Sequence, residues 1–205
     1  MASFLKKLFK AEAPNTITIV SGLPRSGTSM MMKMLEAGGI APLTDKIRTA
    51  DSDNPKGYYE FERVKQMDKG DTAWLADAQG KSVKVISALL KHLPADYQYQ
   101  VIFMRRDMPE ILASQQKMLE RRGEGEAAID DQKMTELFEK HLSSVEQWLN
   151  AQANISTLDL HYSDIVADPL PFIEKINVFL GGTLDTEKML EVVDPTLYRN
   201  RQEAK

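Results

Sequence analysis

The sequence predicts an α/β fold in which a central parallel sheet is flanked by helices. Short apolar runs rich in β-branched residues alternate along the chain with longer stretches of helical periodicity. Glycine and other turn residues separate the two kinds of segment. Strands that alternate with helices pair in parallel through right-handed crossovers. The 205 residues, 42% of them hydrophobic and 27% charged, suffice for one domain with a buried core.

The first half of the chain opens with a strand, a turn and a helix. Residues 16–20 (TITIV) have no polar face, which suits a central strand buried on both sides. Gly38 and Gly39 are a stop signal for the helix that follows the turn. We expect, in order, a strand over 16–20, a helix over 28–37, a long connection over 40–59, a helix from about 60 to 75 and a strand over 82–87.

The second half continues the alternation. Pro109 suits the first turn of a helix, and apolar residues on one side of 131–150 indicate a long amphipathic helix. We expect a strand over 100–104, helices over 109–120 and 131–150, a strand over 154–160, and helices over 169–180 and 187–193.

Residues 1–14 are a short basic amphipathic segment ahead of a single domain over 15–205. Lysines and large apolar residues interleave in residues 1–10, which favours either weak attachment to an anionic membrane or partner, or a helix packed on the domain. No apolar run approaches the ~20 residues that span a bilayer. The absence of cysteine fits a cytoplasmic protein, with peripheral contact at the inner membrane surface left open. A net charge of -4 argues against nucleic-acid binding.

The turn after the first strand has the spacing of a phosphate-binding P-loop. Gly22 and Gly27 are separated by four residues, between a predicted strand and a predicted helix. Backbone amides in such a loop converge on one anion, and the helix dipole adds positive potential. Thr28 and Ser29 add hydroxyl groups beside it. An ordinary strand-to-helix turn would not need this combination.

The cation in this loop is an arginine inside it. A nucleotide triphosphatase places lysine directly after the last glycine, but this chain has Thr28 there. Arg25 supplies the positive charge instead, and a guanidinium can chelate an anionic group with two parallel hydrogen bonds. The loop therefore favours an anion other than the γ-phosphate of ATP or GTP.

A second basic cluster ends the strand at 100–104. Arg105, Arg106 and Asp107 follow that strand, and Ser114 lies in the next predicted helix. Ligands of open α/β sheets bind outside the carboxyl ends of the strands, where both clusters fall. One nucleotide could therefore contact both, although salt bridges to neighbouring helices would also account for the arginine pair.

Together the two clusters resemble the sulfotransferase superfamily, which uses 3'-phosphoadenosine 5'-phosphosulfate (PAPS). Residues 24–29 (PRSGTS) look like the arginine-bearing form of its 5'-phosphosulfate loop. Residues 102–114 look like its 3'-phosphate segment, in which an arginine and a serine lie eight positions apart; this spacing selects Arg106 with Ser114 over Arg105. Residues 54–60 (NPKGYYE) and 161–181 are similar to segments of bacterial members, so the resemblance spans about 16–201.

The resemblance implies a three-layer P-loop-type fold and transfer of a sulfuryl group from PAPS to a hydroxyl or amine. It implies that the nucleotide contacts Pro24, Arg25, Ser26, Gly27, Thr28, Ser29, Arg106 and Ser114. The family's C-terminal clamp with Gly and Trp is not recognisable here. Arg199 in the segment 197–201 is expected to reach the 3'-phosphate in its place, and a solvated basic end is the alternative.

Three residues are predicted to be catalytic. Arg25, with the amides of residues 26–29, is expected to stabilise charge on the leaving group. Lys84 resembles a lysine that other members aim at the bridging oxygen, although an edge-strand lysine is an equal alternative. Glu60 resembles the general base of the arginine-loop enzymes, and Asp45 is the second choice. A glutamate stabilised at a helix N-terminus is the competing interpretation of Glu60.

Several features stay open. His92, His141 and His161 share no metal-ligand spacing, and the expected chemistry requires no metal. The acceptor could be a small molecule, carbohydrate, lipid or peptide, and the oligomeric state is undetermined by the sequence. Two other functions compete: a P-loop nucleotide kinase in which Asp159 holds magnesium, and a noncatalytic nucleotide-binding module that docks through residues 1–10.

Overall fold

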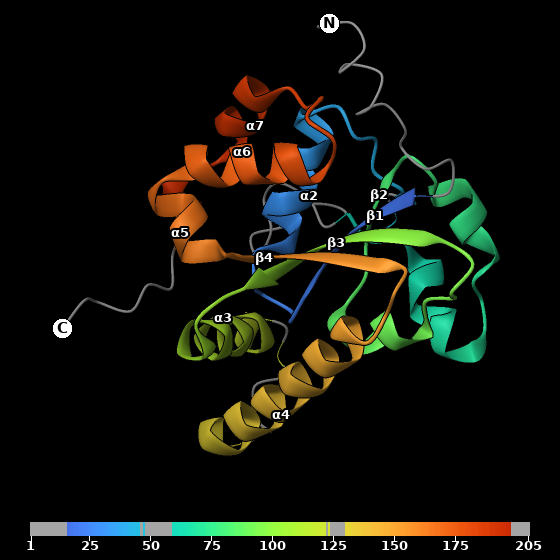
Figure 1. Ribbon diagram of the computed structural model, residues 1–205. Helices are drawn as coiled ribbons and strands as arrows, with labels where there is room; N and C mark the ends of the chain where they lie inside the picture. Colours follow the sequence, from blue (N-terminus) through green and yellow to red (C-terminus); the bar gives the residue numbers. More distant parts are fainter. Residues whose placement is uncertain (1–15, 46, 48–58, 122, 124–129, 198–205) are drawn as a thin grey trace, which may run out of the picture.

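A four-stranded parallel sheet forms the centre of the molecule in a computed structural model (Figure 1). The structure describes residues 16–45, 47, 59–121, 123 and 130–197. The strands are β1 (Thr16–Gly22), β2 (Ser82–Lys84), β3 (Gln98–Arg105) and β4 (Ile155–His161). Their order is β2-β1-β3-β4, and every neighbouring pair is parallel. The predicted parallel sheet flanked by helices is therefore confirmed.

The strand β1 lies inside the sheet, as its apolar sequence predicted. Val20 pairs in register with Lys84 of β2 on one side and with Ile102 of β3 on the other. Its residues from Ile17 to Gly22 are all buried. Because β1 is paired on both edges and covered on both faces, its last residue is held in place. The turn after β1 therefore begins from a fixed position.

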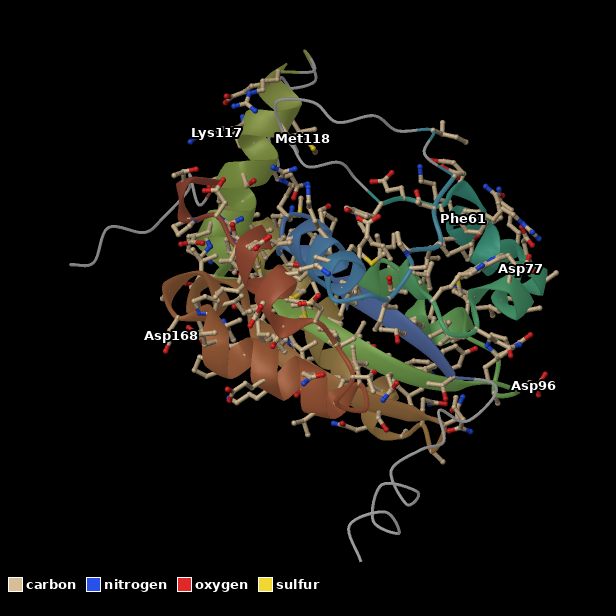
Figure 2. The ribbon with its side chains drawn as sticks, turned by 90° about the horizontal axis from the view of Figure 1, so that it is seen from above. Phe61, Asp77, Asp96, Lys117, Met118 and Asp168 are labelled. Carbon is tan, nitrogen blue, oxygen red and sulfur yellow. The ribbon has the colours of Figure 1, made fainter. Side chains whose placement is uncertain are left out.

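Helices cover both faces of the sheet. Above it in Figure 1 lie α2 (Thr28–Ala37), α5 (Tyr162–Ala167), α6 (Pro169–Phe179) and α7 (Thr186–Val192), and below it lie α3 (Met108–Arg121) and α4 (Asp131–Asn150). Four 3-10 helices complete the described elements: η1 (Glu62–Lys69), η2 (Ala73–Ala78), η3 (Ser87–His92) and η4 (Pro195–Leu197). Figure 2 shows Asp168, where α5 meets α6, and Asp77 of η2 on opposite sides of the molecule.

Two hydrophobic clusters fill the spaces between these layers. Successive residues of β1 belong to different clusters: Ile19 lies in the cluster of Trp74 of η2, whereas Val20 lies in that of Met31 of α2. This alternation follows from the two-residue period of a strand. The methionines of α2 at positions 31, 32 and 34 are fully buried, so they fill the core. The molecule thus has the predicted three layers.

Three local predictions differ from the structure. The helix expected over 60–75 is two 3-10 helices, because Gly70 adopts a left-handed φ of 89° and ends η1. The strand expected over 82–87 ends at Lys84, and η3 begins at Ser87. The short helix α5 was not predicted, although Tyr162, Ile165 and Val166 have the i, i+3, i+4 spacing of a buried helical face.

The described helices include none that is long and apolar enough to cross a membrane. The predicted basic segment at residues 1–14 lies outside the described residues.

Candidate functional site

The turn between β1 and α2 is shaped by two glycines. Gly22 pairs with Met104 of β3, and a Cβ at this position would lie 2.5 Å from the Met104 carbonyl oxygen. Gly27 has a φ of 96°, and a Cβ there would lie 2.5 Å from Cδ2 of Tyr162. Larger residues would therefore push the loop away from β3 and α5. Ser26 closes the turn because its hydroxyl donates to the Leu23 carbonyl at 2.7 Å.

The start of α2 presents backbone amides at this turn. Among the described residues, none accepts a hydrogen bond from the amides of Gly27, Thr28 or Ser29. The amide of Ser26 differs, because it donates to the Leu23 carbonyl at 3.2 Å. It was expected to bind the anion, but it is already engaged inside the turn. The remaining three amides lie at the positive end of the α2 dipole, which favours a bound anion.

Arg25 occupies a strained position in the loop. Its φ is 71°, a left-handed conformation that side chains other than glycine rarely adopt. Its Nε donates to the Ser114 hydroxyl of α3 at 2.9 Å, and the Ser114 side chain is buried. This contact spans 89 positions in the sequence and holds the guanidinium against α3. The assignment of Ser114 to the 3'-phosphate of the nucleotide stays a prediction.

Arg106 contacts the same loop from the end of β3. Its Nη1 donates to the Arg25 carbonyl at 3.0 Å, and its Nε donates to Oε2 of Glu110 at 2.9 Å. Its Cζ lies 4.8 Å from the centre of the Tyr162 ring. The side chains of Arg106 and Glu110 are only 9% and 3% exposed, so this is a buried ion pair. Sequence reasoning missed Glu110, although its i, i+4 spacing from Arg106 was a usable signal.

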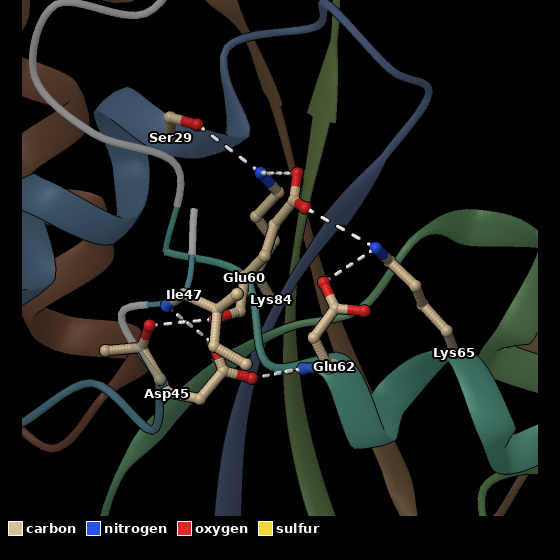
Figure 3. Close-up of polar contacts among 8 residues, drawn as sticks. Ser29, Asp45, Ile47, Glu60, Glu62, Lys65 and Lys84 are labelled. Atoms are coloured by element: carbon tan, nitrogen blue, oxygen red, sulfur yellow. Dashed lines mark hydrogen bonds and ion pairs between the residues drawn. The ribbon is translucent and has the colours of Figure 1, made fainter. Parts of the chain in front are cut away.

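Lys84 and Glu60 lie beside the α2 N-terminus (Figure 3). The Lys84 ammonium lies 3.4 Å from the Ser29 hydroxyl and 3.8 Å from Oε1 of Glu60. Oε2 of Glu60 lies 3.9 Å from the ammonium of Lys65. The structure therefore brings together the loop hydroxyl, a lysine and a carboxylate from three separate segments. Such a cluster can hold an anion and accept a proton from a neighbouring group.

Asp45 supports this carboxylate through the backbone. Its side chain accepts from the amide of Glu62 at 2.6 Å and from the amide of Ile47 at 3.1 Å (Figure 3). The Thr44 hydroxyl donates to the Glu60 carbonyl at 2.8 Å. Asp45, the second candidate for a base, thus caps the start of η1 and fixes the segment that carries Glu60.

Tyr59 fixes the same segment from the side of α2. Its φ of 54° is left-handed, and its hydroxyl donates to the Glu36 carboxylate of α2. Burial, and then the hydrogen bond to Glu36, raise the pKa of the Tyr59 hydroxyl well above its ordinary value. The hydroxyl therefore stays protonated and remains a donor at neutral pH.

Residues 15–205 match the model of the sulfotransferase domain family. The chain belongs to this family. The solved structures that resemble it include sulfotransferase STF1 from Mycobacterium tuberculosis, with 16% identity over 94% of this chain and 73% of that one and a TM-score of 0.56. The sulfotransferase domain of the Synechococcus olefin synthase shares 15% identity over 96% and 91% of the two chains, with a TM-score of 0.53. A mouse sulfotransferase, SULT7A1, complexed with PAP shares 19% identity over 94% and 66%, with a TM-score of 0.54. At these identities the solved structures establish the fold alone, and the comparison with curated proteins gave no match.

In this sulfotransferase domain the two consecutive arginines have different surroundings. Nε of Arg105 lies 2.6 Å from Oδ1 of Asp159 on β4, and its Nη2 lies 3.9 Å from Glu146. Asp159 is half exposed and pairs with this cation rather than standing alone as a metal ligand. Arg105 therefore pairs with a residue of β4, whereas Arg106 contacts the loop; that Arg106 binds the 3'-phosphate stays a prediction.

The remaining predicted positions lie apart from these contacts. Pro24 is exposed on the loop, whereas Arg199 and the segment 48–58 fall outside the described residues. Nε2 of His141 on α4 lies 2.8 Å from the Ser87 hydroxyl, and burial lowers the pKa of His141. No group of three or more His, Asp or Glu residues that could hold a metal occurs in the described part of the chain.

Proposed function

We propose that this protein is a PAPS-dependent sulfotransferase that moves a sulfuryl group to a hydroxyl or amine acceptor. The proposal rests on one observation above all. The loop between β1 and α2 carries Arg25 and the amides of the α2 N-terminus, and Lys84 and Glu60 lie next to its Ser29 end. The amides, Arg25 and Lys84 are donors that suit a phosphosulfate, which carries several anionic oxygens and needs no lysine after the last glycine. The complex of the mouse family member with PAP, the product of PAPS, supports the same donor.

The amides of Gly27, Thr28 and Ser29 and the Arg25 guanidinium would hold the phosphosulfate. Bound PAPS supplies the sulfuryl group: the acceptor forms the new bond to sulfur while the sulfur–oxygen bond to phosphate breaks and its electrons pass to the phosphate. Arg25 and Lys84 place positive charge where the leaving phosphate gains negative charge. Arg25 is held by its hydrogen bond to Ser114 before the reaction, so this cation need not reorganise during it.

Glu60 is the proposed general base. Its carboxylate lies 3.8 Å from the Lys84 ammonium, and Lys84 in turn lies 3.4 Å from the Ser29 hydroxyl of the loop. An acceptor positioned between the loop and Glu60 would pass its proton to this carboxylate as it attacks. The Thr44 hydroxyl holds the Glu60 carbonyl, and Asp45 holds the amide of Glu62 two residues further on. The acceptor class is left open, because residues 48–58 lie outside the description.

Thermal shift with adenosine 3',5'-bisphosphate tests this proposal. At 100 times its Kd a ligand stabilises the folded state by about 2.7 kcal/mol, which corresponds to roughly 5–10 °C for a domain of this size. We expect that shift in the wild type and a much smaller one in Arg25→Ala, with Arg63→Ala as the control for removal of an exposed arginine. A shift with magnesium-ATP but none with the bisphosphate would favour the kinase alternative.

Activity follows from an acceptor screen with radiolabelled PAPS. Hydroxyl-bearing and amine-bearing compounds from the carbohydrate, lipid, peptide and small-metabolite classes are each incubated with PAPS and the protein. We expect label transfer to at least one class, lost in Glu60→Gln while bisphosphate binding persists. Transfer that survives in Glu60→Gln would remove the assignment of the base.

A further inference from the structure

The backbone of Arg25 requires something to hold it. Its φ of 71° is the left-handed conformation, which a residue with a Cβ keeps only where the surrounding structure fixes it. With the backbone in this conformation, Nε of Arg25 donates to the Ser114 hydroxyl at 2.9 Å. Whatever fixes this peptide therefore also fixes the cation that the proposed function assigns to the donor.

Arg106 contacts that peptide directly. Its Nη1 donates to the Arg25 carbonyl at 3.0 Å from a position 81 residues away in the sequence. The plane of Arg106 packs 4.8 Å from the Tyr162 ring, and the same ring lies against Gly27. Arg106 and Tyr162 thus support the loop at two neighbouring points. A bond from a fixed guanidinium can keep the Arg25 carbonyl in place only if Arg106 is itself held.

Glu110 holds Arg106. Its Oε2 accepts from Nε of Arg106 at 2.9 Å, and its side chain is only 3% exposed. A carboxylate buried to this degree is retained only where a charged partner and hydrogen bonds compensate for its lost hydration. The pair lies one helical turn apart, at the junction of β3 and α3. None of the catalytic steps proposed above uses Glu110.

We propose that Glu110 is a positioning residue that, through Arg106, keeps Arg25 in its left-handed conformation and so prearranges the anion loop before the donor binds. The proposal deepens the function proposed above, because it gives Arg106 a task at the 5' end of the donor in addition to the 3'-phosphate. Ser114 completes the arrangement by accepting from Nε of Arg25. One buried carboxylate thereby governs the geometry of the sulfate side of the site.

A double-mutant cycle with Arg25→Gly tests this coupling. Glycine adopts the left-handed conformation at little cost. A loop with glycine at position 25 therefore no longer needs Glu110 and Arg106 to keep that conformation. We expect Glu110→Gln to lower the urea midpoint clearly in the Arg25 background and by much less in the Arg25→Gly background. Glu120→Gln, at an exposed position on the same helix, controls for the loss of one carboxylate. This readout needs no ligand.

Bisphosphate affinity gives the second readout of the same cycle. We expect Glu110→Gln to weaken the binding of adenosine 3',5'-bisphosphate about tenfold beside Arg25, and within about twofold beside Arg25→Gly. If Glu110 acted only on a contact between Arg106 and the 3'-phosphate, the tenfold loss would persist in both backgrounds. A general loss of stability would likewise lower the midpoint equally in both, and either result would overturn the proposal.

Arg106→Lys provides a variant that does not bury an unpaired charge. A lysine can still pair with Glu110, but it lacks the planar fork by which Arg106 donates to Glu110 from Nε and to the Arg25 carbonyl from Nη1. We expect the same dependence on the residue at position 25 as for Glu110→Gln. Equal effects of Arg106→Lys in the two backgrounds would contradict the proposal that Glu110 acts on Arg25 through Arg106. If the wild type does not bind the bisphosphate, the proposed function fails, while the stability cycle still decides this inference.

Discussion

The two sides of the candidate site differ in how firmly they are built. On the Arg25 side the hydrogen bonds are 2.9–3.0 Å long, and Ser114 and Glu110 are almost fully buried. On the Lys84 side the separations are 3.4–3.9 Å, and the Lys65 side chain is 54% exposed. The first side has a fixed shape before any ligand binds. The second is held by longer contacts.

The difference follows from what each side is attached to. The loop with Arg25 lies between β1 and α2 and contacts Ser114 in the middle of α3 and Arg106 just after β3. Glu60 belongs to a segment that precedes a 3-10 helix and is held by the side chains of Thr44 and Asp45. We therefore expect donor binding to depend on how the Arg25 loop packs on the core. Proton transfer should depend on how Thr44 and Asp45 hold the segment with Glu60.

Arg25→Gly should lower kcat strongly without a loss of stability. Loss of a preorganised charge at a leaving group costs about 10²–10³ in kcat. Glycine also removes left-handed strain of roughly 1–2 kcal/mol, so the Tm should not fall despite the loss of the hydrogen bond to Ser114. Steady-state kinetics with PAPS and thermal melts measure the two quantities. A large drop in Tm together with the loss of activity would mean that the Arg25 contacts stabilise more than the strain costs.

Gly27→Ala should affect both folding and donor binding. Its Cβ would lie 2.5 Å from the Tyr162 ring, so the loop must move in addition to adopting an unfavourable φ. We expect a loss of at least about 2 kcal/mol in the free energy of unfolding and of most bisphosphate binding. Gly182→Ala is the matched control. The φ of Gly182 is also positive, but a Cβ added there would meet no atom within 4 Å. Equal losses in both variants would show that the contact with Tyr162 is unimportant.

Glu60→Gln should separate proton transfer from donor binding. Removal of a general base lowers kcat by about 10²–10⁴, whereas the amides and Arg25 still bind the bisphosphate. Glu62→Gln, two positions away and paired with Lys65, should leave kcat within about threefold because surface ion pairs contribute little. Kinetics and calorimetric titration of both variants provide the test. A fall in bisphosphate affinity as large as the fall in kcat would place Glu60 on the donor side.

The smallest expected effect concerns His141 on α4. Burial, and then Lys91, lower the pKa of His141 below its ordinary 6.5, so the folded state favours the neutral ring. Its contribution to stability is therefore complete above pH 6.5 and is lost as the pH falls through the lower folded pKa. Between pH 7 and 5 the wild type should lose slightly more in Tm than His141→Gln does. Identical slopes would show that the contact of the ring with Ser87 does not depend on protonation.

The sequence alone determined most strands and helices in their order along the chain, although not α5, and it placed a turn between Gly22 and Gly27. These features are local: Thr16–Val20 is apolar on both faces, and Gly22 and Gly27 mark the turn. The helical segment after Glu60 was assigned the wrong geometry, because the left-handed Gly70 divides it into two 3-10 helices. Short segments of this kind take their conformation from packing rather than from propensity.

Only the tertiary structure decided which charged groups meet. Arg25 contacts Ser114 and Arg106, and Lys84 lies between Ser29 and Glu60, because separate segments pack at the carboxyl ends of parallel strands. The sequence could nominate these residues by type and spacing. It could not assign partners, since a hydrogen bond depends on a few tenths of an ångström that packing alone sets.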